Sequence, residues 1–498
     1  MFPQSPFAIN VESAEKFLAR AKSGGTEESG DLKFFPVSGA VSEEEEVLHR
    51  FLSGVQGNVL HAHGRTFVTL LFFRFKRTGS VGLASNQAFL VRAGDTVISA
   101  LDQHVDARRR KRNRGNRPFV GIQFTVAGIA AVGRPMPQEP RGVDSFAQGM
   151  LARHELLGDP SRAGRPSTWQ DIYRREGEVH GMWLVGHRTK EGLAAECRRV
   201  VKEGKDWVDI VHREHGVNMR DREGFAREPF GFRDGLSMPK FFKPAKQTGG
   251  LINMPLDRLL IESEGLDSGG SFMVYRKLEQ DVAAFRRFEK TLAPYLRNAG
   301  LSTRDPGRLL IGRLRDGTPL VAGAPRPTRS GNIGNTFSFP GDDEAPRCPF
   351  HAHVRKANFR QADGEVSLPI QAQLGAQFVR RGVVFGRGPR WNPRVVKPAK
   401  CGLLFMAYMA NISGQFETVQ ATWMGGDEFP TRNTSQKDPL MPVSATSESQ
   451  GWQWPQRCIG PLGLPNLVTP RGGAYLFVPP LQWLNPALAG PGAMVGQW

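Results

Sequence analysis

The stretch GSFMVYRKLEQDVAAFRRFEKTL, residues 270–292, carries the pattern on which the predicted fold depends. An apolar run at its start predicts a strand, and the segment that follows predicts a helix. The same order recurs in GLLFMAYMANISGQFETVQATWM (402–424), and AYLFVPPL (474–481) adds a further strand. The C-terminal half is therefore expected to alternate short strands with helices.

A similar alternation is found earlier in the chain. Strands are predicted at 66–75, at the start of 119–133 and at 182–189, and helices at 96–107, at the end of 119–133 and at 193–204. These runs are not the continuous apolar strands of a doubly wound parallel sheet. We predict an α+β fold made of two similar halves with antiparallel sheets.

The predicted boundaries follow changes in composition. Residues 1–50 are polar, end in the acidic run SEEEEV and are expected to form an N-terminal extension. The Gly-rich segment KQTGGLINM separates an N-terminal half, 51–250, from a C-terminal half, 251–498.

Composition excludes several classes of protein. A chain of 498 residues with 39% hydrophobic residues can bury a large core and is not largely disordered. No apolar run is long enough to span a membrane. The cysteines, Cys197, Cys348, Cys401 and Cys458, are scattered and form no C-x-x-C pair. With no signal peptide recognised, the expected location is cytoplasmic, and export by another route stays open.

The chain is strongly basic, with 66 Lys and Arg against 48 Asp and Glu and a net charge of +18. The densest basic run, ARRRKRNRGNR (107–117), leads directly into a predicted strand, which favours a charged loop over a nucleic-acid-binding arm. The remaining arginines are dispersed and match no helix-turn-helix or RNA-binding pattern. Nucleic acid is thus an unlikely partner, whereas attraction of an anionic substrate fits the charge.

Three motifs contain the candidate chemistry. RCPFHAHVRKANFR (347–360) has two histidines, His351 and His353, which an extended segment would place on one side. A single imidazole is enough to hold haem iron, although a lone histidine is more often structural. GFRDG (231–235) predicts a glycine-flanked turn that presents Asp234, and FVRRGVVFGRG (378–388) places an arginine pair before an apolar run. Taken singly, each motif also fits an ordinary turn or a solvated strand edge.

Together the motifs resemble those of the dye-decolorizing peroxidases, a haem-enzyme family, over residues 50–485. GFRDG resembles the family's G-x-x-D-G motif, and 347–360 resembles C-P-F-G-A-H-I-R-K-A-N-P-R, whose histidine aligns with His353. VRRGVVFG is similar to the segment of the family's distal arginine, which corresponds to Arg380. Further matches are VQGNVL (55–60), FTVAGIAAVG (124–133), SFMVYRKL (271–278), LLIGRLRDGTPL (309–320), and GLLF with QFETVQATW (402–423).

The resemblance implies two ferredoxin-like halves with antiparallel sheets and peripheral helices, and haem in the C-terminal half. It implies one haem b per chain with His353 as the proximal iron ligand. Asp234 would move protons of hydrogen peroxide, and Arg380 would support cleavage of its oxygen–oxygen bond. The reducing substrates would be dyes, phenolics or lignin-like compounds oxidised by one-electron steps.

Four further residues receive roles from the resemblance. Leu403 and Phe405 are expected to form the distal apolar wall, and Arg355 to contact a haem propionate. Glu417 is the expected acceptor for the second ring nitrogen of His353. The sequence does not indicate an oligomeric state.

Some alternatives stay open. His351 occupies the position of the family's usual glycine, so ligation through His351 is conceivable. A haem-handling protein or a basic haem-binding protein could use the same scaffold, but neither needs the distal pair of Asp234 and Arg380. Bulky dyes cannot reach a buried haem, so aromatic residues near the surface could relay electrons; Tyr408, Trp423 and Tyr475 are candidates that also suit the core.

Overall fold

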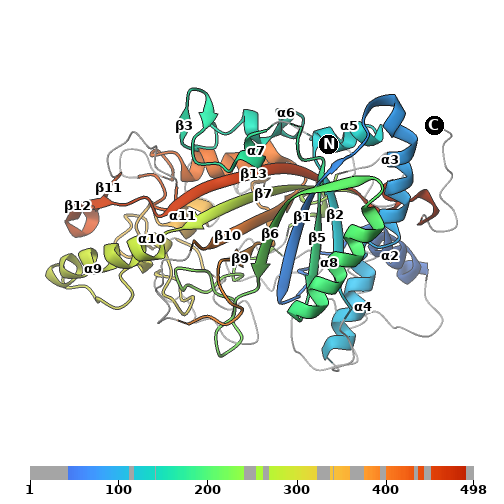
Figure 1. Ribbon diagram of the computed structural model, residues 1–498. Coiled ribbons are helices and arrows are strands. Elements are labelled where there is room, and N and C mark those ends of the chain that lie inside the picture. Colours follow the sequence, from blue (N-terminus) through green and yellow to red (C-terminus); the bar gives the residue numbers. More distant parts are fainter. Residues whose placement is uncertain are drawn as a thin grey trace, which may run out of the picture.

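The structure is a computed structural model of the full chain (Figure 1). It describes residues 43–111, 117–140, 142–175, 177–239, 254–261, 269–321, 337–339, 341–358, 360, 375–392, 400–430, 436–441 and 450–488. The predicted boundary at 250 and the extension before residue 43 lie outside this part of the chain. The helix α2 (Glu43–Gly54) begins within the predicted extension and leads into the first half.

The first half follows a β-α-β-β-α-β order. Its strands are β1 (Phe67–Phe75), β2 (Phe119–Phe124), β5 (Gly181–His187) and β6 (Val208–Val217). They lie in the order β2-β5-β1-β6, and each neighbouring pair is antiparallel. Numbered along the half, the order is 2-3-1-4, as in a ferredoxin-like fold. The helices between them are α3 (Gly79–Gly94), α4 (Ala100–Lys111), α5 (Val126–Val132) and α8 (Lys190–Gly204).

The second half repeats this arrangement. Its strands are β7 (Ser271–Gln280), the short pair β8 (Val379–Arg380) and β9 (Val383–Phe385), β10 (Gly402–Met409) and β13 (Val468–Val478). β7 lies between β13 and β10, and β10 pairs with both short strands, which together take the second position of the motif. The helix α9 (Val282–Asn298) follows β7, and the π-helix η4 (Ile412–Met424) follows β10. The duplicated ferredoxin-like fold implied by the resemblance is confirmed.

The two four-stranded units join into one sheet at two places, each through a single pair of residues. Phe477 of β13 pairs with Phe124 of β2, and Val217 of β6 pairs with Val384 of β9. Because β7 pairs with both β13 and β10, these two joints bring the described strands into a closed ring. Segments of the first half can therefore contact strands of the second half directly.

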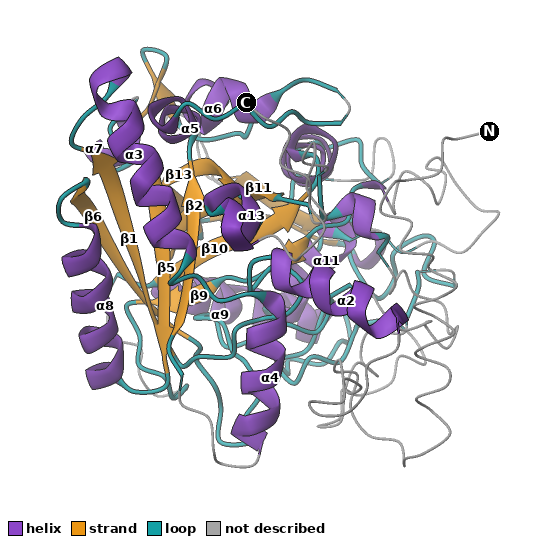
Figure 2. Cartoon of the chain, turned by 90° about the vertical axis from the view of Figure 1, so that its right-hand side faces the viewer, coloured by secondary structure: helices purple, strands orange, loops and turns teal. Residues whose placement is uncertain are grey.

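Aromatic side chains fill much of the core under the helices of the first half. α3 and α8 lie along the strands of this half (Figure 2). Phe89 of α3 packs edge-on against Phe73 and Trp183, with ring centroids 5.8 and 5.5 Å apart. No helix among the described residues has both the length and the apolar composition needed to cross a bilayer.

The remaining elements are short and lie between or beside the two halves. They are α6 (Ser145–Ala152), β3 (Ser161–Arg162), β4 (Arg165–Pro166), α7 (Asp171–Arg174), η2 (Leu256–Arg258), α10 (Arg308–Ile311), α11 (His353–Ala357), β11 (Gln450–Trp454), η5 (Pro455–Arg457), β12 (Ile459–Leu464), α13 (Leu481–Leu484) and η6 (Pro486–Leu488).

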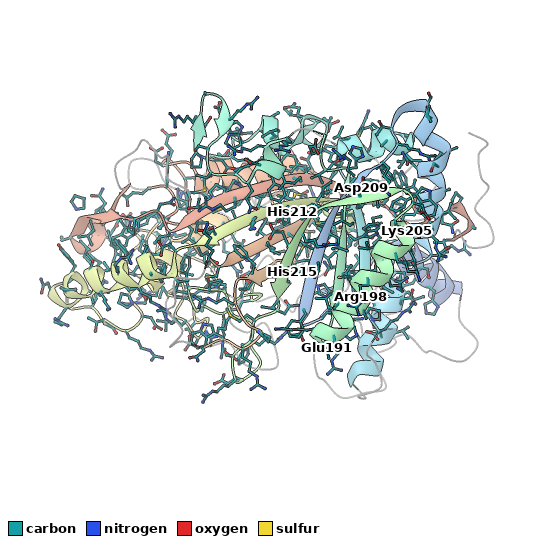
Figure 3. The ribbon with its side chains drawn as sticks, viewed as in Figure 1. Glu191, Arg198, Lys205, Asp209, His212 and His215 are labelled. Carbon is teal, nitrogen blue, oxygen red and sulfur yellow. The ribbon has the colours of Figure 1, made fainter. Side chains whose placement is uncertain are left out.

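The basic run at 107–117 differs from the predicted loop, because α4 continues through residue 111. Residues 112–116 lie outside the described chain. One face of the first half is mixed in sign: along α8, just after it and at the start of β6, the exposed side chains of Glu191, Arg198, Lys205 and Asp209 bring both charges together (Figure 3). This face of the first half is not a uniformly basic surface of the kind that binds nucleic acid.

Candidate active site

His353 begins the short helix α11 and is held through one ring nitrogen. The backbone of Ala352, at φ −59° and ψ 135°, turns the chain into the helix at this point. Nδ1 of His353 lies 2.7 Å from Oδ2 of Asp438, and 30% of the histidine side chain is exposed. A hydrogen bond from Nδ1–H to a carboxylate fixes the tautomer and leaves the lone pair of Nε2 available to a metal.

Asp438 was not identified from the sequence, although it is the acceptor expected for His353. Its side chain is fully buried, and its other oxygen, Oδ1, accepts a hydrogen bond of 2.8 Å from the Leu440 backbone N–H. The carboxylate is thus aimed at the imidazole by the turn that contains it. No motif marks this residue, which lies 85 positions after the histidine.

His351 lies in a different environment from His353. The two histidines do not share one side of an extended segment, because the chain turns at 350–351 and becomes helical at 353. His351 is 2% exposed and packs edge-on against Trp452, with ring centroids 5.6 Å apart. Burial, and then the charge of Lys356, lower the pKa of His351 to about 3, so the ring is neutral at physiological pH.

Arg355, which the resemblance assigns to a haem propionate, makes its contacts in the structure with other groups of the chain. Its guanidinium donates to Oδ2 of Asp342 at 2.9 Å and to the carbonyl of Cys348 at 2.8 Å. The rings of Phe339 and Phe350 lie 4.5 and 4.6 Å from it, and the side chain is buried. Residues two apart on a helix do not share a face, so Arg355 points away from His353 and braces the preceding loop.

Glu417 was expected to accept the hydrogen bond of His353, but Asp438 takes that place. Its two carboxylate oxygens accept hydrogen bonds from Arg153 Nε at 2.5 Å and from the second Arg153 nitrogen at 2.6 Å. Ser145 Oγ and Tyr475 Oη also donate to it, at 2.9 and 2.7 Å. Glu417 therefore belongs to a buried ion pair between η4, α6 and β13, and does not contact His353.

The GFRDG segment forms the predicted turn. Gly231 and Gly235 have φ values of 101° and 76°, which favour glycine. Asp234 Oδ1 accepts from the Gly235 N–H at 2.7 Å, and the Asp234 N–H donates to the Ala226 carbonyl at 3.1 Å. The turn thus presents a half-exposed carboxylate in a defined position, as the sequence predicted.

Arg380 lies next to this carboxylate. Its guanidinium is 3.4 Å from Asp234 Oδ1, a long contact between two side chains that are 35% and 37% exposed. Arg380 of β8 is paired with Ala407 of β10, and side chains alternate along a strand. Arg380 therefore lies on the same face of the sheet as Leu403 and Phe405, both of which are partly exposed while the intervening Leu404 is fully buried.

Two further arginines, Arg313 and Arg360, gather beside the Asp234 turn. Both donate to Ser237 Oγ, at 3.3 and 3.1 Å, and both lie over the ring of Phe337. Burial, and then the charge of Arg380, lower the pKa of Arg313 to about 10. Burial and the charge of Arg313 lower that of Arg360 to about 9. Both remain cationic at neutral pH in a place that disfavours positive charge, an environment that an anionic group would stabilise.

These residues fit a haem group. His353 offers a nitrogen ligand whose ring is oriented by a buried carboxylate, and Leu403 and Phe405 offer apolar surface. Arg313 and Arg360 offer buried cationic donors suited to carboxylate groups such as propionates. Among the described residues, no three His, Cys, Asp or Glu side chains gather as the ligands of a metal ion.

The three aromatic residues considered as surface relays are buried. Tyr408, Trp423 and Tyr475 are 1, 5 and 3% exposed. Tyr408 accepts a hydrogen bond from Asn58, and Trp423 stacks on Phe429. The core role, which the sequence left as the alternative, is the one the structure supports for all three.

Comparisons with known proteins find relatives over most of the chain. No family model matches the chain. The multifunctional dye peroxidase DyP2 of Amycolatopsis sp. is 32% identical over 467 residues, which cover 87% of this chain and 95% of the relative. The crystal structure of an Anabaena sp. DyP-type peroxidase superposes with a TM-score of 0.75 at 28% identity, covering 91% and 98% of the two chains. A dye-decolorizing peroxidase in complex with 2,6-dimethoxyphenol has the same fold, with a TM-score of 0.70 at 22% identity over 88% and 99%.

The extent and identity of the first of these matches are sufficient to assign the family. Relatives of this kind are peroxidases, and their family implies a haem cofactor. The chain belongs to the dye-decolorizing peroxidase family of haem enzymes.

Proposed function

We propose that His353 is the proximal ligand of one haem b per chain, bound in the C-terminal half. The observation that carries this proposal is the 2.7 Å contact between Nδ1 of His353 and the buried carboxylate of Asp438. With Nδ1–H as the donor in that contact, the neutral ring has its lone pair on Nε2, which is the tautomer that an iron ligand requires. A carboxylate acceptor also increases the basicity of the ligating nitrogen.

Asp234 and Arg380 are proposed to act on hydrogen peroxide. Bound haem would supply the redox chemistry, namely cleavage of the oxygen–oxygen bond and acceptance of electrons, one at a time, from an organic reductant. Asp234 would accept a proton from one oxygen of hydrogen peroxide and return it to the other, which would leave as water, while the two oxidising equivalents would pass to the haem. Arg380, 3.4 Å from Asp234, stabilises negative charge that develops on the departing oxygen.

Arg313 and Arg360 are proposed to bind the haem propionates, in place of Arg355. Their shared contact with Ser237 joins this cationic pair to the Asp234 turn. Leu403 and Phe405, on the face that carries Arg380, form an apolar wall that limits water near the reacting oxygens.

Phenols and related aromatic compounds are the proposed reducing substrates. The chain shares its fold with a relative whose structure contains 2,6-dimethoxyphenol, and the family as a whole is named for dye oxidation. The net charge of +18 would favour anionic members of this class, such as sulfonated dyes, at low ionic strength.

The experiment that tests the proposal is an absorption spectrum of the haem-reconstituted protein before and after hydrogen peroxide, with two histidine variants. We expect a Soret band that peroxide alters, loss of haem in His353→Ala, and retention of haem in His351→Ala. Loss of haem in His351→Ala alone would overturn the assignment of the ligand. Absence of a Soret band after reconstitution of the unaltered protein would overturn the peroxidase proposal.

A further inference from the structure

Arg381, the residue after the proposed distal arginine, donates hydrogen bonds from its guanidinium to four backbone carbonyls. Its Nε donates to the Asn58 carbonyl at 3.0 Å, and one terminal nitrogen donates to the carbonyls of Val59 and Leu60 at 3.3 and 3.1 Å. The other terminal nitrogen donates to the carbonyl of Arg380 at 3.1 Å. One guanidinium therefore joins a loop of the first half to the backbone that carries Arg380.

The same side chain reaches the turn of the other distal residue. Its second terminal nitrogen lies 3.8 Å from the sulfur of Met238, four positions after Asp234. The Arg381 backbone N–H donates to the Met406 carbonyl at 2.7 Å, which fixes this segment against β10. Arg381 thus contacts all three segments that meet beside the distal pair.

The loop that receives the guanidinium is itself held in place. Asn58 has a φ of 71°, a conformation that non-glycine residues rarely adopt. Its side chain donates to Tyr408 Oη at 3.0 Å and accepts from the His63 N–H at 3.1 Å. Its backbone N–H donates to Gln103 Oε1 at 2.6 Å. These contacts present the carbonyls of residues 58–60 as a preformed acceptor for the guanidinium.

The distal pair needs such support, because its own contact is weak. The Arg380 guanidinium and the Asp234 carboxylate are 3.4 Å apart and each more than a third exposed. A long, exposed ion pair holds two flexible side chains poorly. Their relative position must therefore come from the backbone segments on which they lie.

We propose that Arg381 is a positioning residue for the peroxide reaction, which sets the place of Arg380 relative to Asp234 by tying β8 and the Asp234 turn to residues 58–60 of the first half. This inference deepens the proposed function and rests on it, since Arg380 must act on peroxide for its position to matter. It also gives the first half a role in a site whose cofactor lies in the second half. Burial lowers the pKa of Arg381 to about 10, so the side chain is charged at working pH.

Arg381→Lys is the informative variant, because lysine keeps the charge but cannot reproduce the planar set of donors. The measurement is the second-order rate constant of the peroxide-dependent spectral change in the haem-loaded protein, together with haem content, Tm and KM for the reducing substrate. Arg308→Lys is the matched control. Arg308 is also a buried arginine, and it donates to backbone carbonyls of Ser302, Arg304 and Asp305 rather than to the distal segments.

We expect Arg381→Lys to lower the peroxide rate constant about tenfold or more, with haem content and KM unchanged. Arg308→Lys should lower Tm without this change in rate. Asn58→Gly, which retains the positive φ but removes the side-chain contacts of the loop, should lower the rate constant in the same direction by a smaller factor.

A double-mutant cycle with Arg380→Lys separates positioning from a general loss of structure. If Arg381 acts through Arg380, Arg381→Lys should change the rate constant less than about twofold in the Arg380→Lys background. An equal loss in both backgrounds, or an unchanged rate constant in Arg381→Lys alone, would overturn the inference. The single variant Arg380→Lys reports separately on the proposed function: if it reacts with peroxide at the original rate, the role of Arg380 itself is wrong.

Discussion

The contact between Asp438 and His353 leads to a quantitative prediction for Asp438→Asn. The buried carboxylate has two donors, the imidazole N–H at 2.7 Å on one oxygen and the Leu440 N–H at 2.8 Å on the other. An asparagine has a single oxygen, so one of these donors must face the amide NH₂. The substitution keeps the volume of the side chain but leaves one partly buried donor without its acceptor.

The size of the effect follows from that loss. An unsatisfied buried donor costs about 1–3 kcal/mol, and the lost bond has a charged acceptor. If His353 bears the cost, the affinity for haem should fall about 5- to 150-fold. Outer partners of metal-ligating histidines typically contribute about 10- to 100-fold in metal affinity, in agreement with this range.

The assay is the rate and extent of haem transfer from the loaded protein to an excess of a haem-binding acceptor protein, followed in the Soret band. Glu417→Gln is the matched control, because Glu417 is a buried carboxylate with several donors that makes no contact with His353. This control should lower Tm but change haem affinity less than about twofold. Unchanged haem affinity in Asp438→Asn, or a greater loss in Glu417→Gln, would refute the assignment of Asp438.

Three further substitutions test separate parts of the structure. Asp234→Asn should lower the rate of the peroxide-dependent spectral change, measured by stopped-flow absorption, about a hundredfold or more while haem stays bound. A rate within about tenfold of that of the unaltered protein would contradict the proton-transfer role of Asp234. Tyr408→Phe removes the acceptor of the Asn58 amide and should lower the free energy of unfolding, measured by denaturant titration, by about 1–2 kcal/mol. An unchanged denaturation midpoint would show that this hydrogen bond does not contribute to stability. Burial lowers the pKa of Lys356 to about 8 in the folded protein, from about 10.5 when unfolded. Between pH 8 and 10.5 the unfolded state therefore binds more protons than the folded state. Because of this, the contribution of Lys356 to the free energy of unfolding rises with pH. The free energy of unfolding of the parent relative to Lys356→Met should thus increase by about 3 kcal/mol across that window, and a difference independent of pH argues against the buried cation.

The strands predicted from the sequence correspond well to the structure where apolar runs are long. Residues 66–75 match β1 (Phe67–Phe75), and 182–189 match β5 (Gly181–His187) within two residues. The strand β6 was missed because its sequence, VDIVHREHGV, mixes charges with short apolar residues, and several of its side chains face solvent. The helix α3 was missed as well, since its three glycines and small residues give little helical periodicity.

The sequence predicts those site residues that lie in contiguous motifs. His353, Asp234 and Arg380 each lie in such a motif, and the structure brings Asp234 and Arg380 within 3.4 Å although 146 positions separate them. The π-helical geometry of η4 could not be seen, because the sequence pattern indicates only a helix. Arg360 did have a signal, since it ends the same motif as His353.

Arg355 and Glu417 show that a local sequence pattern does not determine which groups a side chain contacts. Arg355 was assigned by its closeness in sequence to His353, but a helix turns about 200° over two residues, and the side chain faces the opposite way. Glu417 was assigned as a carboxylate in a matching segment, but its acceptors are already occupied by Arg153, Ser145 and Tyr475.

Arg313 and Arg360 are buried cations beside the Asp234 turn, and their charge limits which groups can bind there. Burial and the charge of a neighbouring arginine lower the pKa of Arg313 and of Arg360, so positive charge beside the Asp234 turn is costly to the folded state. Such a cluster is stable when an anion neutralises it, and the two propionates of a haem would do so.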